Sequence, residues 1–199
     1  MRSPPGRSSP TSASAAPTSA SSGGPGDKEL AVENSGRPPG EGSITLDPRD
    51  VDEPTITLPR PPGWEFLPSN DSPPVRGVLY SQELRRHGFT PNAVVTMEDL
   101  TGQVALPAQA LAKERAAVSA VIGELDTDIP GTVSGFPSRT ITYNLQGRPA
   151  TGLLIAVQNT KARIWVITVT LQTTDADNPH YIAAKQAVLD SLEVRLPTP

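Results

Sequence analysis

The chain has 199 residues, of which 36% are hydrophobic, so it can bury one core of ordinary size but hardly two. Its formal net charge of −4 gives no electrostatic reason to bind a phosphate backbone, which argues against nucleic acid as a partner. The absence of cysteine excludes disulfides, thiolate catalysis, zinc–cysteine sites and iron–sulfur clusters. No apolar run reaches the roughly 18 residues that a membrane-spanning helix needs.

Residues 1–42 consist mainly of Ser, Pro, Gly, Ala and Thr. A segment of this composition cannot bury enough apolar surface to offset roughly 1–2 kcal/mol of backbone entropy per residue. We therefore predict a disordered tether over residues 1–42 and a folded domain over residues 43–197. A low-complexity tail unrelated to the domain is the alternative interpretation of the first segment.

Short segments of alternating or β-branched residues predict strands in the first half of the domain. These segments are residues 55–58, 77–80 and 93–97. Residues 59–63 are rich in proline and predict a turn, because proline cannot extend a ladder of hydrogen bonds.

A helix is predicted over residues 106–125, because Leu111, Val118, Ile122 and Leu125 recur on one helical face. Alternating segments then predict three consecutive antiparallel strands joined by short turns. These strands are residues 140–146, 151–158 and 163–173. The first turn is expected at residues 146–148 and the second at residues 159–161.

A last helix is predicted to open at Asn178-Pro179, a capping residue followed by proline, and to end before Pro197. Strands, a helix, a three-stranded meander and a second helix together predict an α+β fold. In this fold an antiparallel sheet is flanked by helices.

Four segments resemble the LpqN/LpqT lipoproteins of mycobacteria in order and spacing. They are residues 52–65 (DEPTITLPRPPGWE), residues 77–80 (GVLY), residues 134–138 (SGFPS) and the hairpin around Gly147. The resemblance implies a Mog1/PsbP-like α/β/α sandwich and export from the cell. It also implies attachment of the N-terminus to the outer face of the plasma membrane through a lipidated cysteine.

The sequence departs from this family in having no cysteine, so the lipidation motif of those proteins is not present. Two explanations remain open: the chain starts just after the lipidation site, or it is a member secreted without an anchor. In either case the resemblance implies a place in the cell envelope, on the outer face of the plasma membrane or beyond it. Any membrane attachment would depend on an anchor that this chain lacks.

Residues able to do chemistry are sparse, so we expect no enzyme, no metal site and no cofactor. His87 lies in a polar loop, and His180 lies in the first turn of the last helix beside Asp175 and Asp177. Residues 131–135 have the wrong spacing for a nucleophile elbow, which leaves Ser134 as a turn residue. Four other carboxylates would form an acidic pocket only if folding brought them together. A position at solvated strand and loop ends explains them more simply. These carboxylates are Glu98, Asp99, Asp126 and Asp128.

The residues we single out as partner or ligand contacts are Trp64, Arg85, Arg86 and His87. With the family resemblance, they predict a monomeric, non-enzymatic binding module that acts as an adaptor for envelope or secreted proteins. The alternative is a carrier of envelope lipids or another apolar ligand in a cavity between sheet and helix. Small residues on the first predicted helix would leave room for that cavity: Ala108, Ala112, Ala116 and Ala120.

Overall fold

The structure is a computed structural model that describes residues 42–69 and 73–198. The tether predicted for residues 1–42 lies, apart from Gly42, outside these ranges. The elements in chain order are β1 (Gly42–Leu46), β2 (Thr55–Arg60), β3 (Glu65–Pro68), β4 (Val75–Tyr80), β5 (Asn92–Asp99), α1 (Pro107–Ile122), β6 (Thr127–Val133), β7 (Phe136–Leu145), β8 (Arg148–Gln158), β9 (Ile164–Gln172), α2 (Pro179–Ser191) and β10 (Glu193–Arg195).

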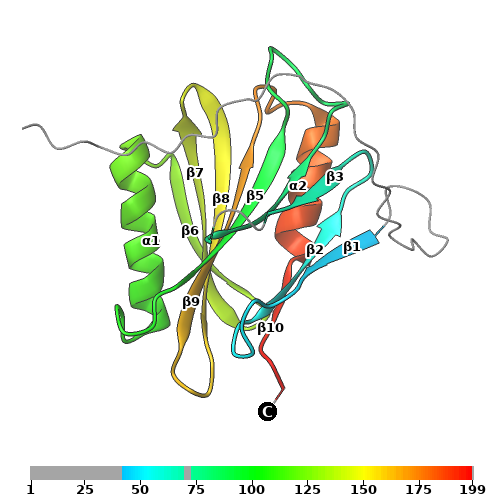
Figure 1. Ribbon diagram of the computed structural model, residues 1–199. Coiled ribbons are helices and arrows are strands. Elements are labelled where there is room, and N and C mark those ends of the chain that lie inside the picture. Colours follow the sequence, from blue (N-terminus) through cyan, green and yellow to red (C-terminus); the bar gives the residue numbers. More distant parts are fainter. Residues whose placement is uncertain (1–41, 70–72, 199) are drawn as a thin grey trace, which may run out of the picture. The chain divides into compact units, whose positions relative to one another are not determined.

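The strands form two antiparallel sheets. The long sheet has seven strands in the order β3-β4-β5-β9-β8-β7-β6, and the short sheet has three in the order β1-β2-β10. Helices α1 and α2 lie on opposite sides of the long sheet (Figure 1). The prediction of an α+β fold with an antiparallel sheet flanked by helices is confirmed, and every predicted strand is present. The separate short sheet was not predicted.

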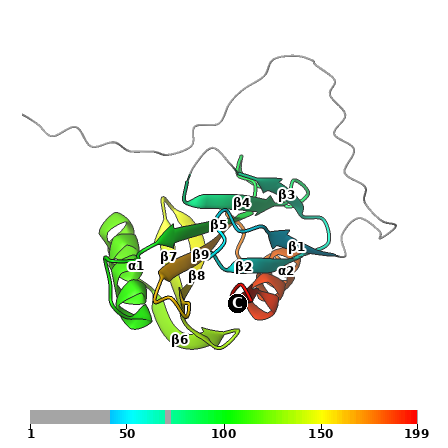
Figure 2. The same ribbon diagram turned by 60° about the horizontal axis from the view of Figure 1, so that its bottom comes forward.

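The long sheet has a hydrophobic core on each face. Leu154 of β8 and Val166 of β9 belong to the core that α1 closes, together with Leu111 of the helix itself. Ile155 and Ile167, the next residues along the same strands, belong to the core shared with the short sheet and α2. The domain thus has three layers, namely α1, the long sheet, and the short sheet together with α2, and Figure 2 shows them from a second direction. Because side chains alternate along a strand, β8 and β9 are buried on both faces.

Tight two-residue turns connect β6 to β7 and β7 to β8. Gln146 and Gly147 both have positive φ, 54° and 80°, which is the geometry of a type I′ turn that matches the twist of the flanking strands. The hairpin predicted at residues 146–148 is therefore confirmed. Ser134 and Gly135 adopt the same conformation between β6 and β7, with φ of 51° and 83°.

The chain's end differs from the prediction. Asn178 caps α2 as expected, because its side-chain oxygen accepts hydrogen bonds from the backbone N–H groups of His180 and Tyr181. The helix ends at Ser191, before Pro197 as expected, but the residues after it form the short strand β10, which was not predicted. Pairing explains the difference, since β10 joins the edge of β2, and the Ser134 hydroxyl accepts a hydrogen bond of 2.9 Å from the backbone N–H of Val194.

Candidate functional site

A groove lies where the turn before β3, the loop between β4 and β5, and one side of α2 meet. It has a volume of about 420 Å³, and a second hollow of about 500 Å³ adjoins it and shares part of its lining. We call the two together the α2 groove. Representative lining residues from its three segments are Pro61, Trp64, Leu84, Arg86, His180 and Ala187.

The position of Trp64 follows from the local sequence. Residues 61–64 form a tight turn in which the Trp64 N–H donates to the Pro61 carbonyl at 3.1 Å, and Gly63 supplies the positive φ of 73°. Proline at the second position and glycine at the third are typical of a type II turn. The turn directs Trp64 inward, where the residue is only 4% exposed and stacks on Tyr181 with 6.4 Å between ring centroids. Trp64 is thus a core residue that also contributes to the groove floor.

The wall formed by α2 is low because its residues are small. Ala183, Ala184 and Ala187 line the groove on this side. Tyr181, on the inner side of the helix, is buried, and burial raises the pKa of its hydroxyl. The phenol therefore stays protonated at neutral pH and has no role as a base. The α2 wall offers apolar contact area and space.

The opposite rim is a small hairpin that carries the predicted basic residues. Arg86 and Phe89 exchange backbone hydrogen bonds of 3.0 and 2.9 Å, and the Thr174 hydroxyl donates to the Arg86 carbonyl at 3.1 Å. The turn between them is again of type I′, with positive φ at His87 and Gly88. The Arg86 backbone is consequently held in place, while its side chain is exposed and lines the groove.

The structure brings two of the four predicted contact residues, Trp64 and Arg86, into one groove. Arg85 and His87 are exposed on the same hairpin. His180 also lines the groove, together with Glu83, although no hydrogen bond joins this imidazole to a carboxylate within the described ranges. Over residues 42–69 and 73–198, no three His, Asp or Glu side chains gather closely enough to hold a metal ion.

The acidic pocket considered for residues 98–128 does not form. Asp99 lies at the end of β5 and Asp128 lies on β6, and β9, β8 and β7 separate these two strands in the sheet. Each carboxylate contacts arginine instead. A hydrogen bond from Arg139 and then one from Arg115 hold the pKa of Asp128 below its ordinary value.

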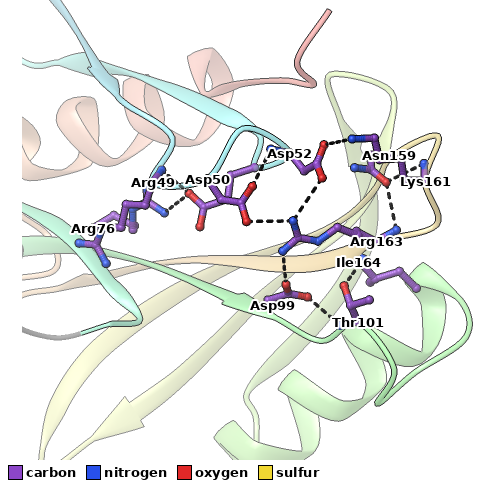
Figure 3. Close-up of polar contacts among 11 residues, drawn as sticks. Arg49, Asp50, Asp52, Arg76, Asp99, Thr101, Asn159, Lys161, Arg163 and Ile164 are labelled. Atoms are coloured by element: carbon purple, nitrogen blue, oxygen red, sulfur yellow. Dashed lines mark hydrogen bonds and ion pairs between the residues drawn. The ribbon is translucent and has the colours of Figure 1, made fainter. Parts of the chain in front are cut away.

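A network of charged side chains lies at the other end of β5, away from the groove (Figure 3). The Arg163 guanidinium contacts Asp50 at 3.0 Å and Asp99 at 2.6 Å, and Lys161 contacts Asp52 at 2.6 Å. These contacts tie the loop between β1 and β2 to the long sheet. Because the acids and bases satisfy one another, we interpret the network as structural.

The network predicts a stability that depends on pH. The Asp52 N–H and Arg163 hold the pKa of Asp50 below its ordinary value. Burial of Asp99 opposes its ionisation, but hydrogen bonds from Thr101 and Arg163 outweigh burial and lower its pKa as well. Carboxyls whose pKa is depressed by folding stabilise the protein above their unfolded-state pKa of about 3.9, and this contribution is lost as the pH falls through their folded-state pKa.

We therefore expect the free energy of unfolding to fall as the pH decreases below about 4. Arg163→Met should reduce the slope of this fall, because unfolding of the variant takes up fewer protons, by up to about two. Urea unfolding at a series of pH values measures the slope. Arg195→Met is the control, since Arg195 is exposed and contacts only Glu193. Equal slopes for the wild type and Arg163→Met would contradict the role given to Arg163.

The ligand cavity of a carrier was expected beside the alanines of the first predicted helix. The alanines considered for that purpose, Ala108, Ala112, Ala116 and Ala120, face solvent, whereas Ala110 and Leu111 are buried against the sheet. Ala108 and Ala112 do line an open hollow of about 370 Å³ beside α1, but Arg115, Asp128 and Arg139 share its lining, so it offers no enclosed apolar space for an alkyl chain. Neither described helix combines the length and apolar character required to cross a membrane.

The fold and the groove define the class of protein, a layered α+β domain with an open, largely apolar groove at one end of its long sheet. Comparison with known proteins gives the family. The family model described as "Probable lipoprotein LpqN" matches residues 43–195, and the chain belongs to that family, as the sequence resemblance indicated. No curated protein matches the chain.

The solved structure of one LpqN protein shares the fold of this chain, and two other solved structures match it less well. The crystal structure of LpqN from Mycobacterium tuberculosis, described as involved in cell envelope biogenesis, matches with a TM-score of 0.63 at 19% identity and covers 77% of this chain and 91% of its own. The Ran-binding protein Mog1p of Saccharomyces cerevisiae matches with a TM-score of 0.47 at 12% identity, covering 77% of this chain and 95% of its own. A Pseudomonas aeruginosa protein of unknown function matches with a TM-score of 0.46 at 16% identity, covering 72% and 92%.

Proposed function

We propose that the chain is a non-enzymatic module of the cell envelope that binds a protein partner in the α2 groove. Membership of a lipoprotein family supports the location, as does the description of the M. tuberculosis relative as involved in cell envelope biogenesis. In this proposal the domain acts as a monomer on the outer face of the plasma membrane or beyond it. Its task is to hold another envelope or secreted protein.

The observation that carries the proposal is the construction of the groove. Its apolar floor and low α2 wall lie beside an exposed arginine, Arg86, whose backbone is fixed by hydrogen bonds. Preformed apolar surface with a few placed polar groups is typical of binding sites. Acid–base or nucleophilic catalysis would require a positioned pair of groups, and His180 and Glu83 share the groove without a hydrogen bond between them in the described residues.

The carrier of apolar ligands is the weaker candidate. A carrier would need to shield an alkyl chain from water, and the alanine face considered for that purpose is turned to solvent. The α2 groove itself is apolar enough to contact an alkyl chain, so the experiment must be able to detect lipid.

We expect a photo-crosslinking amino acid in place of Ala187 to give a discrete protein adduct in cells of the source organism. Ala187 lines the groove from α2, so a partner seated there lies within reach of the probe. The adduct is detected by a mobility shift of the full chain and identified by mass spectrometry. Ala183→Trp, which fills the groove from the same helix, should abolish the adduct.

The control carries the same probe in place of Ala120, which is exposed on α1 and lies on the opposite side of the long sheet from α2. This position should give no adduct of the same mass. Adducts whose mass is that of lipid would replace the adaptor with the carrier. Equal protein adducts from both positions, or no adduct from Ala187, would count against a partner in the groove.

A further inference from the structure

The arginines of the described residues fall into three groups. One group contacts carboxylates: Arg76, Arg115, Arg139, Arg163 and Arg195. Arg49 donates instead to the backbone carbonyls of Ser69, Pro73 and Val75. Over residues 42–69 and 73–198, the remaining arginines form no ion pair. They are Arg60, Arg85, Arg86 and Arg148.

Three of these four arginines lie at the α2 groove or on the hairpin that forms its rim. Arg60 and Arg86 line it, and Arg85 precedes Arg86 on the same hairpin. The guanidinium of Arg148 stacks over the ring of Phe89, on the far side of that hairpin, at 4.8 Å from the ring centroid. Within the described residues of a chain whose formal net charge is −4, three of the four unpaired arginines are thus gathered at the groove and its rim.

The carboxylates near this end do not neutralise these arginines. Glu65 accepts a hydrogen bond of 2.7 Å from the Tyr80 hydroxyl, and Asp175 accepts one of 3.3 Å from the Asn178 side chain. Glu83 lines the groove and, within the described ranges, forms no ion pair. The Glu65 and Glu83 carboxylates in the lining keep their charge, so the positive charge of the rim is concentrated on the exposed hairpin that carries Arg85 and Arg86. Such a charge distribution favours an anionic partner.

The fixed hairpin lowers the conformational entropy that is lost when Arg86 binds a partner. Three backbone hydrogen bonds hold Arg86 in place before any partner arrives, so only its side chain must be ordered on binding. The Arg86 guanidinium donates one hydrogen bond of 3.0 Å to the Arg85 carbonyl and has no carboxylate partner in the described residues, so its other N–H groups can donate to a carboxylate of a partner. The apolar floor beside it offers a place for an apolar side chain.

We infer that the α2 groove and its arginine-bearing hairpin bind a protein segment in which an acidic side chain adjoins an apolar one. The apolar side chain lies on the floor over Trp64, and the carboxylate pairs with Arg86, with Arg85 reinforcing the positive field. This inference rests on the proposed function and adds the chemistry of the partner to it.

Two features favour a peptide segment over the surface of an anionic membrane. The apolar floor is recessed between the turn at residues 61–64 and α2, where one protruding side chain can reach it and a flat layer of headgroups cannot. The Glu83 carboxylate in the wall can accept hydrogen bonds from the backbone N–H groups of a peptide, which phospholipid headgroups do not offer.

The test is selection of random heptapeptides displayed on phage against the full immobilised chain. We expect the wild type to enrich peptides in which Asp or Glu adjoins Leu, Ile, Val or Phe, and Arg86→Glu to enrich Lys or Arg at the acidic position. An acidic peptide chosen on the wild type should bind Arg86→Glu about 10–100-fold more weakly. Arg195→Glu, which changes an exposed arginine on β10, should bind that peptide like the wild type.

The other outcomes separate this inference from the proposed function. If Ala187→Trp abolishes peptide binding while Arg86→Glu leaves the preference unchanged, the groove binds peptides but does not recognise acid, and only the inference fails. If no acidic peptide is enriched but the wild type binds vesicles of equal phosphatidylglycerol and phosphatidylcholine, the partner is a membrane and the inference is overturned. Thermal unfolding of each variant confirms that a loss of binding is not a loss of folding.

Discussion

Replacing Leu154 with alanine is expected to lower the free energy of unfolding by about 2–5 kcal/mol. Leu154 lies on β8, is fully buried, and belongs to the core that α1 closes over the long sheet. Truncation removes its apolar contacts and leaves a cavity whose walls relax only in part. Because β8 is hydrogen-bonded to both β7 and β9, its backbone has little freedom to move into the space. Urea unfolding followed by circular dichroism measures the loss.

Two further substitutions calibrate this result. Ile155→Val removes one methylene from the opposite face of the same strand and is expected to cost about 0.5–1.5 kcal/mol. Ile129→Ala truncates a side chain that is 59% exposed on the edge strand β6, and should change stability by no more than about 0.5 kcal/mol. If Leu154→Ala cost no more than Ile129→Ala, the core between β8 and α1 would not contribute as the structure indicates.

The strands that the sequence predicts correctly are those in which the order of apolar and polar residues matches the burial of each side chain. β2 and β5 alternate between buried and half-exposed positions, so a period of two is visible in the residues themselves. β8 and β9 contain the apolar runs of residues 153–157 and 164–167, and such runs are typical of strands buried on two faces. For these strands the local pattern and the tertiary environment agree.

The strands that the sequence analysis missed depend on a partner. β6 contains Pro130 and Gly131, which on their own favour a turn, yet the segment pairs with β7 along its whole length. β10 is only three residues long, and its strand conformation comes from β2 and from the hydrogen bond to Ser134. Leu192 continues the apolar stripe of the last helix, so no local signal indicates that a strand begins directly after it. Its burial is in fact against the core that includes the short sheet.

The sequence analysis predicted only some of the residues that line the α2 groove. Trp64 and Arg86 attracted attention through residue type, but nothing local shows that residues 61–64, 81–86 and 178–187 meet, because that contact depends on the packing of α2 against the sheets. One signal was available. The last helix carries Ala183, Ala184 and Ala187 close together, and small residues of this kind were considered only on the first helix, where they face solvent.

Removing the carboxylate of Glu53 is the second substitution with a large expected effect. Arg76 on β4 has a side chain that is only 4% exposed, and its guanidinium donates to Glu53 at 2.9 Å and to the Asp47 carbonyl at 2.6 Å. Glu53→Ala leaves this guanidinium buried without its counter-ion, which is expected to cost about 3–5 kcal/mol. Chemical denaturation measures the cost. Glu193→Ala, which breaks the exposed pair with Arg195, is the control and should cost roughly 0–1 kcal/mol.

A double substitution separates the worth of the ion pair from the cost of breaking it. In the Glu53→Leu, Arg76→Met variant neither charge remains buried, so the protein should be more stable than with Glu53→Ala alone, because apolar residues of similar volume replace a buried pair at little or no cost. The Asp47 carbonyl would then lose a donor, which sets a penalty of about 1–3 kcal/mol on the double variant. If the double variant were less stable than Glu53→Ala, Arg76 would matter chiefly as the donor that joins the end of β1 to β4, and the carboxylate of Glu53 would be secondary.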